Sequence, residues 1–378
     1  MINPRLIGFR CIRCEADYPI DDYAEGCLAC YAAGFPASVI PRYLQLPPFT
    51  ASPSRGTPRF ADRLPYTSFL SLGEGDTPLV SLDRMAGELG LDALMVKAEY
   101  ANPTGSHKDR MSVQFIARAM ARGAAVVAAA SSGNAGVSLA SYAAAAGLRC
   151  VIVTTPKISP AWRGAMERTG AELRFVEDPL ERWRLIQEKT ASEGWVSATN
   201  VLRPPTGSEP FGVDGYKTLG YELAEHPETA EADAIIVPTA RGDLLWGIYR
   251  GFQELIAERR IDSMPRLVAV EPFPRLERVL AGADLRGSFP GSSPLASIGG
   301  TTVTYQAVAA ILGSDGRAVS VQPEDVAADQ RGLARAGLYL ELSAAAALTG
   351  LKAARAPGCP EFRRVVLIAT SHGYKDAP

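Results

Sequence analysis

The stretch NPTGSHKDRM, residues 102–111, contains a lysine in an unusual setting. A Pro-Thr-Gly turn precedes Ser106, which can cap a helix, and Asp109 three residues later completes a capping-box pattern. Lys108 would then lie in the first helical turn, where the helix dipole and partial burial both favour the neutral amine. A neutral lysine can form a Schiff base with an aldehyde. A solvated lysine that pairs with Asp109 is the alternative interpretation of this stretch.

A second cluster of small and polar residues follows the apolar run AAVVAAA and precedes a predicted helix. It consists of Ser131, Ser132, Gly133, Asn134 and Ala135. Backbone N–H groups of such a loop at a helix start can bind a carboxylate or another anion. A simple helix cap would explain one serine and one glycine of this run, but not the whole run.

A third cluster lies between the strand-like run AIIVP and a long predicted helix. Thr239, Ala240, Arg241 and Gly242 offer a hydroxyl, backbone amides and a guanidinium to a phosphate group. The signal is weak by itself, because the loop has a single glycine and Asp243 follows it directly.

Two Cys-x2-Cys pairs near the N-terminus have the spacing of a tetrahedral zinc site. The four candidate ligands are Cys11, Cys14, Cys27 and Cys30. A chance arrangement or a degenerate relic of such a site is the alternative. The surrounding residues are neither basic nor aromatic enough for a nucleic-acid finger, so we expect a structural zinc ion.

The rest of the chain must supply the elements that position these residues. From about residue 76, short apolar runs alternate with amphipathic stretches of ten to eighteen residues. The runs ALMVKAEY, AAVVAAA, RCVIVTT, AELRFVE, AIIVPTA, RLVAVEP, RAVSVQ and RRVVLIAT are predicted to be buried strands. Strands that are apolar on both faces and separated by helices indicate parallel sheets covered on both sides, which predicts an α/β fold.

The overall composition narrows the class of protein. A chain of 378 residues suits two or three domains, and its net charge of −2 with scattered basic residues argues against a nucleic-acid or membrane-surface role. We see no leader sequence and no apolar run long enough to span a bilayer, so a cytoplasmic protein is the default expectation. The proline- and serine-rich residues 46–65 are expected to form a linker or an irregular wrapping segment.

Six motifs together resemble the fold-type II pyridoxal-phosphate enzymes (the tryptophan synthase beta superfamily), in particular the threonine synthases. They are LGEGDTPLV (72–80), VKAEYANPTGSHKDR (96–110), SSGNAGVSLASYAAAAG (131–147), DGYKTLGYEL (214–223), ELSAAAAL (341–348) and TSHGYKD (370–376). They occur in the order of the family and cover the chain from about residue 70 to its end. The cysteine pairs resemble the zinc-ribbon-like head of some threonine synthases.

The resemblance implies a role for each cluster. Lys108 would bind the cofactor covalently and move protons at the substrate carbon, and Asn134 would bond the hydroxyl of the cofactor ring. Thr370 or Ser371 would face the pyridine nitrogen with a neutral hydroxyl, which suits elimination and replacement chemistry. The remaining matches are a substrate-carboxylate loop of Ser131, Ser132, Gly133 and Ala135, and a cofactor-phosphate loop of Thr239, Ala240, Arg241 and Gly242.

The same resemblance implies an architecture of two parallel-sheet, three-layer domains with the active site between them, and a homodimer. We expect a head at 1–45, a large cofactor-binding domain formed by 46–105 and 201–378, and a small substrate-loop domain at 106–200.

One departure concerns the substrate. Threonine synthases often have an arginine in an Asn-Pro-x-Arg run that helps to bind the substrate phosphate, whereas this chain has Phe211 and Gly212 there. Arg203 is a displaced substitute. The leading expectation is a threonine synthase-like enzyme that converts O-phosphohomoserine to threonine. A serine or threonine ammonia-lyase and a β-replacement synthase of the cysteate or diaminopropionate type are alternatives.

Two interpretations of other classes also remain. One is a non-catalytic relative that binds the cofactor or an amino acid, and the other is a cysteine head that binds a protein or nucleic-acid partner. His107 also departs from the family, in which phenylalanine commonly precedes the lysine. We expect it to be a packing ring, and a proton relay is the alternative.

Overall fold

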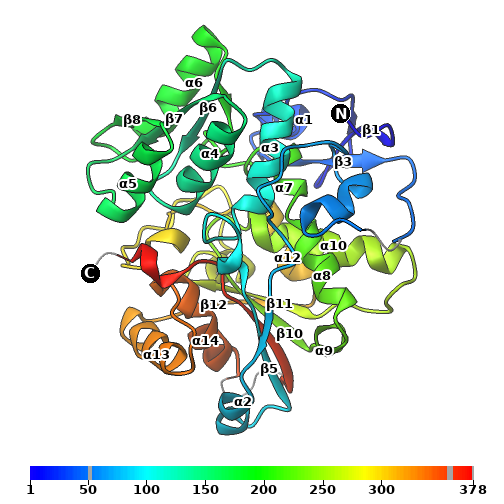
Figure 1. Ribbon diagram of the computed structural model, residues 1–378, viewed down its shortest axis with the longest axis vertical. Coiled ribbons are helices and arrows are strands. Elements are labelled where there is room, and N and C mark those ends of the chain that lie inside the picture. The colour runs from blue at the N-terminus through cyan, green and yellow to red at the C-terminus, as the bar shows by residue number, and fades with distance from the viewer. Residues whose placement is uncertain (50–52, 356–360, 377–378) are drawn as a thin grey trace.

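The computed structural model describes residues 1–49, 53–355 and 361–376, whose strands form three separate sheets (Figure 1). A six-stranded sheet and a four-stranded sheet form the two main bodies of the molecule, and a three-stranded sheet belongs to the N-terminal head. Residues 50–52 of the proline-rich segment lie outside the described residues. The rest of that segment includes a 3-10 helix, η1 (Thr57–Arg63).

The six-stranded sheet has the order β12-β11-β10-β13-β5-β4. Its strands are β4 (Leu79–Ser81), β5 (Ala93–Lys97), β10 (Ala234–Pro238), β11 (Arg266–Glu271), β12 (Arg317–Ser320) and β13 (Arg364–Ile368). All neighbours pair in parallel except β4, which runs antiparallel to β5 at the edge of the sheet. The edge strand β4 was not predicted, because it is short and packs on one neighbour.

Alternate residues of this sheet point to two different cores, as expected for a sheet covered on both faces. Ile235 and Val237 pack with residues of α10 and α12, while Ala234 and Ile236 pack with residues of α2, α13 and α14. The apolar runs in the sequence therefore reflect burial on both sides.

The four-stranded sheet has the order β8-β7-β6-β9 and is parallel throughout. Its strands are β6 (Val126–Ala130), β7 (Arg149–Thr154), β8 (Glu172–Phe175) and β9 (Val196–Ser197). One face contributes Val127 and Ile152 to the core that contains residues of α3, α4 and α5, and the other packs against Trp183 and Ile186 of α6. The eight strands predicted from apolar runs are all present, and the two-residue strand β9 was missed because it is too short to give a pattern.

Helices connect the strands of both sheets. Their bounds are α2 (Asp83–Leu89), α3 (Asp109–Ala121), α4 (Asn134–Ala145), α5 (Pro160–Arg168), α6 (Glu181–Glu193), α7 (Pro210–Asp214), α8 (Lys217–Glu225), α9 (Pro227–Ala230), α10 (Asp243–Ala257), α11 (Leu276–Leu280), α12 (Tyr305–Gly313), α13 (Pro323–Arg335) and α14 (Leu342–Ala354). Helices α8 and α10 pack so closely that a Cβ atom added to Gly251 would lie 2.4 Å from the carbonyl oxygen of Lys217. Backbone contact of this kind requires glycine at the crossing.

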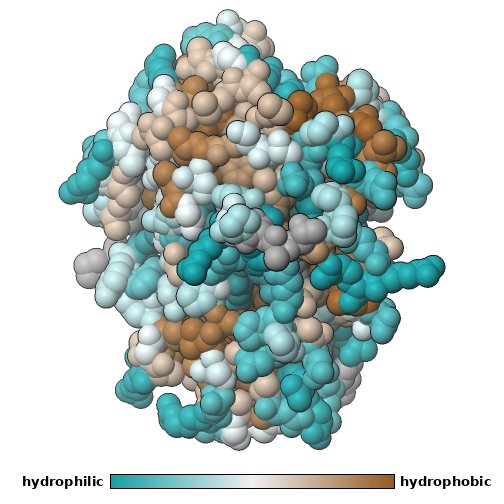
Figure 2. Space-filling model, turned by 45° about the vertical axis from the view of Figure 1, so that its right-hand side comes forward, coloured by the Kyte–Doolittle hydropathy of each residue, from teal (hydrophilic) through white to brown (hydrophobic). Residues whose placement is uncertain are grey.

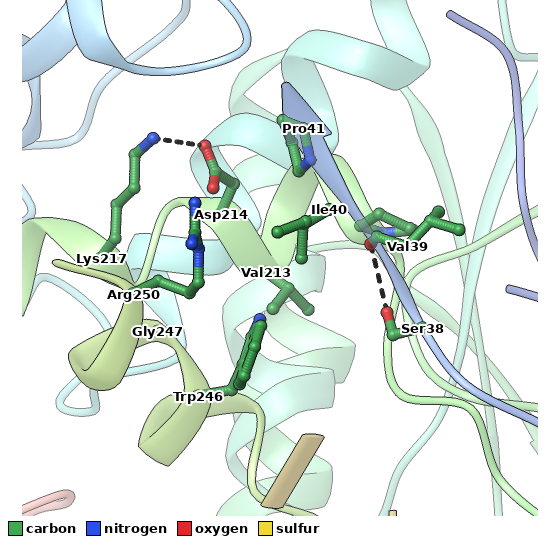
Figure 3. A pocket seen from close by; sticks show the side chains of 11 residues that line it. Ser38, Val39, Ile40, Pro41, Val213, Asp214, Lys217, Trp246, Gly247 and Arg250 are labelled. Atoms are coloured by element: carbon green, nitrogen blue, oxygen red, sulfur yellow. Dashed lines mark hydrogen bonds and ion pairs between the residues drawn. The ribbon is translucent and has the colours of Figure 1, made fainter. Parts of the chain in front are cut away.

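The head consists of β1 (Leu6–Cys11), β2 (Asp17–Tyr18), β3 (Val39–Tyr43) and the short helix α1 (Leu28–Ala32). It docks on α7 and α8 through polar contacts. The Tyr43 hydroxyl donates to Asp214 at 2.7 Å, and the Asp214 carboxylate pairs with Lys217 at 2.9 Å. A small pocket lies at this junction and is lined by Ile40 and Pro41 of β3 and by Trp246 of α10 (Figure 3).

The surface is mixed in character. Figure 2 shows one face of the molecule, on which hydrophobic areas are interrupted by hydrophilic side chains. Among the described residues, no helix is both long and apolar enough to cross a bilayer.

The docking of the head predicts the effect of Tyr43→Phe. This change removes one hydrogen bond to a buried carboxylate, and we expect the free energy of unfolding to fall by about 1–2 kcal/mol. Urea denaturation of the whole chain measures it. Tyr31→Phe is the matched control, because Tyr31 lies in α1 of the same head and is 40% exposed. Equal stability of the two variants would show that the Tyr43–Asp214 bond does not stabilise the docking.

Candidate active site

Lys108 lies directly before α3, at the position that flanks its first turn. The predicted capping box is wrong. The Ser106 hydroxyl is buried without a hydrogen-bond partner among the described residues, and the Asp109 carboxylate accepts from the backbone N–H and the hydroxyl of Thr104, at 2.7 and 2.5 Å. Helix α3 begins at Asp109 with Lys108 in the N-cap position, so Ser106 lies two residues too early in the chain to cap it.

The Lys108 side chain reaches a partly buried position between several charged groups. Its Nζ lies 5.7 Å from the centroid of the Tyr216 ring, and among the described residues it has no hydrogen-bond or ion-pair partner. Burial lowers the pKa of Lys108, the nearby Asp243 opposes this shift, and Arg241 adds to it. The lysine is therefore more easily deprotonated than a surface lysine, as the sequence predicted.

His107 packs against Tyr216, with ring centroids 5.7 Å apart. Burial and the charge of Lys108 hold the pKa of His107 well below its usual range, so the ring is neutral. Its Nδ1 lies 3.2 Å from the carbonyl oxygen of Thr370, which can only accept, so Nδ1 carries the proton. The backbone N–H of His107 donates to the same oxygen at 3.1 Å. The residue joins the start of α3 to the end of β13.

A buried ion-pair network fixes α3 just beyond Lys108. Arg110 is fully buried, and its guanidinium bonds Glu99 at 2.7 and 2.8 Å and Glu222 at 2.7 and 2.8 Å. Lys97 pairs with Glu222 at 2.7 Å. Although burial disfavours its charge, Arg110 and Lys97 lower the pKa of Glu222 to about 2. Sequence analysis missed this network; its signal was the presence of charged residues inside apolar runs.

Asn134 lies at the start of α4 and reaches across to the other sheet. Its Nδ2 donates to Glu341 at 2.8 Å, and its Oδ1 accepts from Ser371 at 3.1 Å and from Lys375 at 2.7 Å. Burial lowers the pKa of Lys375 to about 8, against the charges of Glu341 and Asp109. The sequence singled out Asn134 and Ser371 but not Lys375 or Glu341, although both belong to the quoted family motifs.

The loop before α4 contains some polar groups that are hydrogen-bonded within the protein and others that have no partner among the described residues. The Ser131 hydroxyl accepts from the N–H groups of Gly133 and Gly136, at 3.2 and 2.9 Å, so it caps the helix. Ser132 bonds Thr154 at 2.9 Å. The backbone N–H groups of Asn134 and Ala135, in the first turn of α4, have no partner among the described residues and remain available to an anion.

The loop 239–242 lies at the carboxyl end of β10 and leads into α10. The Thr239 hydroxyl donates to the carbonyl of Val237 at 2.7 Å, so its proton is already used within the strand. Gly242 has a φ of +86°, and a Cβ there would lie 2.4 Å from the Cβ of Ala307. Arg241 has a buried Nε without a partner among the described residues.

Three unsatisfied buried groups lie on elements around Lys108: Ser106 Oγ, the Tyr216 hydroxyl and Arg241 Nε. Buried polar atoms without partners are uncommon in folded proteins and indicate a missing ligand or water. The position of Arg241 before the N-terminus of α10 suits a phosphate, and Lys108 supplies an amine for an aldehyde. The residues present therefore fit pyridoxal phosphate.

The chain has Gly212 where the family often carries a substrate arginine, and the surroundings of this glycine are tightly packed. A Cβ atom on Gly212 would lie 3.0 Å from Cγ of Met111 and 3.1 Å from Cβ of Phe115, because α7 packs closely on α3. Arg203, considered as a substitute, is exposed. A different cation must bind a doubly charged substrate if one is used.

The four head cysteines form a single cluster. Their sulfur atoms all lie within 4.8 Å of one another, with Cys11 to Cys30 at 3.7 Å and Cys14 to Cys27 at 3.5 Å. Zinc bound tetrahedrally at about 2.3 Å would separate its sulfur ligands by about 3.8 Å. The cluster could therefore hold a metal ion.

The network around Arg110 predicts a large loss of stability for Arg110→Gln. The change leaves Glu99 and Glu222 buried without their partner, so we expect the free energy of unfolding to fall by about 3–5 kcal/mol in chemical denaturation. Arg122→Gln is the control on the same helix, because Arg122 pairs with Asp22 near the surface and should cost less than about 1 kcal/mol. Similar losses for both variants would contradict the importance of the buried network.

Comparison with known proteins identifies the family. The model of the family described as pyridoxal-phosphate dependent enzyme matches residues 70–371. The threonine synthase of Methanocaldococcus jannaschii is 29% identical over 384 residues, covering 97% of this chain and 92% of that protein. The threonine synthase of Halalkalibacterium halodurans is 30% identical and covers 82% of this chain and 85% of its own length.

Solved structures share the fold. Cysteine synthase from Entamoeba histolytica has a TM-score of 0.64 at 20% identity and covers 88% of this chain and 91% of its own. O-ureido-L-serine synthase has a TM-score of 0.63 at 24% identity and covers 79% of this chain and 90% of its own. The chain therefore belongs to the pyridoxal-phosphate-dependent enzymes of fold type II, and it is a threonine synthase-like enzyme of the lyase type.

Proposed function

We propose that the enzyme converts O-phosphohomoserine to threonine. The observation that carries the proposal is the position of Lys108, whose charge interacts with Arg241 and Asp243 at the start of α10, while Asn134 of α4 bonds Ser371 and Lys375 after β13. The near-complete alignment with the threonine synthase of Methanocaldococcus jannaschii supports the same substrate. The conversion releases phosphate from the γ carbon and adds water at the β carbon.

Lys108 has the central role in this proposal. When bound, pyridoxal phosphate supplies an aldehyde to a lysine amine and a ring that takes up charge from the substrate α carbon. The lowered pKa of Lys108 leaves more of its Nζ neutral, so that it can accept and return a proton at that carbon. His107 and Arg110 hold the backbone on either side of Lys108 and so restrict where Nζ can reach.

The other site residues would bind and orient. Asn134 would bond the ring hydroxyl, and Thr370 or Ser371 would face the ring nitrogen. Arg241, with the backbone N–H groups of Ala240 and Gly242, would bind the cofactor phosphate at the start of α10, whereas the Thr239 N–H already donates to the carbonyl of Val270 at 2.8 Å. The substrate carboxylate would bind the loop of Ser131, Ser132, Gly133 and Ala135.

A serine or threonine ammonia-lyase or a β-replacement synthase is the second candidate. The observation that favours it is Gly212, which takes the place of the arginine of the Asn-Pro-x-Arg run and packs tightly on α3. Such substrates do not all carry a phosphate and would not need that cation.

We further propose a structural zinc ion on Cys11, Cys14, Cys27 and Cys30. The separation of the two main sheets supports domain limits of 1–45 for the head, 46–105 with 201–378 for the large domain, and 106–200 for the small domain. A homodimer in the cytoplasm is proposed from the family resemblance.

The role of Lys108 predicts a spectroscopic result. The protein purified with pyridoxal phosphate should show a long-wavelength absorption band that is altered or lost in Lys108→Ala but kept in the control Lys157→Ala, which changes an exposed lysine. Phosphate release from O-phosphohomoserine should fall by about 100-fold or more in Lys108→Ala.

Other substrates decide between the two candidates. If only serine, threonine or O-phosphoserine perturbs the band, the second candidate function is correct. The absence of the band at excess cofactor would show that Lys108 does not hold it.

The zinc proposal predicts the metal content of the protein. Elemental analysis should find about one zinc ion per chain in the wild type and much less in Cys14→Ser, because three ligands bind less tightly than four. Cys150→Ala is the control, since Cys150 lies in β7 away from the head. Equal zinc content in all three proteins would place the metal elsewhere.

A further inference from the structure

Two arginines from different parts of the fold, Arg182 and Arg241, lie close enough for their charges to interact. Arg241 follows β10 of the six-stranded sheet, and Arg182 lies in the first turn of α6, which covers the four-stranded sheet. Among the described residues, neither guanidinium forms an ion pair within 4 Å. Both arginine side chains are partly buried. The Arg241 guanidinium lies 5.0 Å from the centroid of the Trp183 ring, and Trp183 follows Arg182 in the sequence.

The electrostatics of this pair are unfavourable as they stand. Burial lowers the pKa of Arg241 to about 10, Asp243 opposes the shift, and the charge of Arg182 adds to it. Burial also lowers the pKa of Arg182, with Asp178 acting against it. In addition, Arg182 places a positive charge at the positive end of a 13-residue helix. An anion between the two guanidiniums would relieve all of these costs.

Arg182 is directly linked to the loop proposed for the substrate. Its Nη1 donates to the Ser132 hydroxyl at 3.2 Å, and its Nε donates to the carbonyl of Pro179 at 2.9 Å. One nitrogen, Nη2, has no bond among the described residues. The guanidinium is thus oriented toward the substrate loop with donor capacity to spare.

The proposed function assigns two of the three expected anions. Arg241 and the start of α10 take the cofactor phosphate, and the loop of Ser131, Ser132, Gly133 and Ala135 takes the substrate carboxylate. The phosphate on the substrate's γ carbon still lacks a cation, because the chain has a glycine, Gly212, where the family often has an arginine.

We propose that Arg182, which the Ser132 hydroxyl orients, binds the phosphate group of the substrate and supplies the cation that is absent at Gly212. The inference rests on the proposed function for the identity of the substrate, but not for the existence of the anion site. Arg182 is a specificity-determining residue in this assignment, since it distinguishes a phosphorylated amino acid from an uncharged one.

The test compares the holoenzymes of the wild type, Arg182→Gln and Arg184→Gln. Arg184 lies on the same helix with a side chain 67% exposed and pairs with Glu181, so it is the matched control. Calorimetry with inorganic phosphate measures the anion site directly. We expect affinity to fall by about 10- to 100-fold in Arg182→Gln and to stay unchanged in Arg184→Gln. Wild-type affinity in Arg182→Gln would overturn the proposal, whatever the substrate is.

A second measurement assigns the anion to the substrate. Half-saturation of the spectral change by O-phosphohomoserine should rise by about 10- to 100-fold in Arg182→Gln, whereas that by L-threonine, which has the carboxylate but no phosphate, should not change. An equal rise for threonine would place Arg182 on the carboxylate and overturn the assignment. Loss of bound cofactor in the variant would do the same by placing Arg182 on the cofactor phosphate.

The two proposals fail in distinguishable ways. If O-phosphohomoserine leaves the wild-type spectrum unchanged, the proposed function fails, while the calorimetric comparison still decides whether Arg182 binds phosphate. Should Arg182→Gln not fold, Arg182→Lys keeps the charge without the planar fork and should weaken phosphate binding to a smaller extent. In that case, phosphate binding by Arg182→Lys that is as tight as in the wild type would overturn the proposal.

Discussion

The buried guanidinium of Arg110 is the constraint on which the rest of the site depends. It is fully buried and forms bidentate contacts with Glu99, which follows β5, and with Glu222, which lies in α8. A charge in this position is tolerated only when its partners are complete. The start of α3 is therefore tied to the six-stranded sheet and to α8 at one point. Lys108 lies two residues earlier, so its backbone is held in the same way.

The position of the candidate site between the two sheets follows from these contacts of Arg110. Helix α3 leaves the end of β5 in the six-stranded sheet and packs on α4, which covers the four-stranded sheet. Residues from both sides then meet across the junction. Asn134 of α4 bonds Ser371 and Lys375 after β13, and Arg182 of α6 lies near Arg241 after β10. Polar residues that follow strands of the six-stranded sheet thus interact with residues at the starts of helices that cover the four-stranded sheet.

Close backbone packing sets which side chains the site can contain. At Gly212 an added Cβ would be in tight contact with Met111 and Phe115 of α3, and at Gly242 the turn requires both a positive φ and the absence of a Cβ. Gly212 supplies no cation at the place where the family often has an arginine, and Gly242 allows the turn that leads into α10. In the function that we propose, the cation for the substrate phosphate comes from another element and is Arg182 of α6.

The amino-acid sequence by itself determined the fold class, the eight main strands, the lowered pKa of Lys108 and the cysteine cluster. It could do so because burial on both faces of a strand, helix periodicity and ligand spacing are local patterns. Only the tertiary structure decided four features of the site. They are the absence of a capping box at Ser106, the Arg110 network, the position of Lys375 and the proximity of Arg182 to Arg241. Each depends on which distant groups come within hydrogen-bonding or charge-interaction distance, and sequence spacing carries no information about contacts between residues such as Arg110 and Glu222, or Asn134 and Lys375.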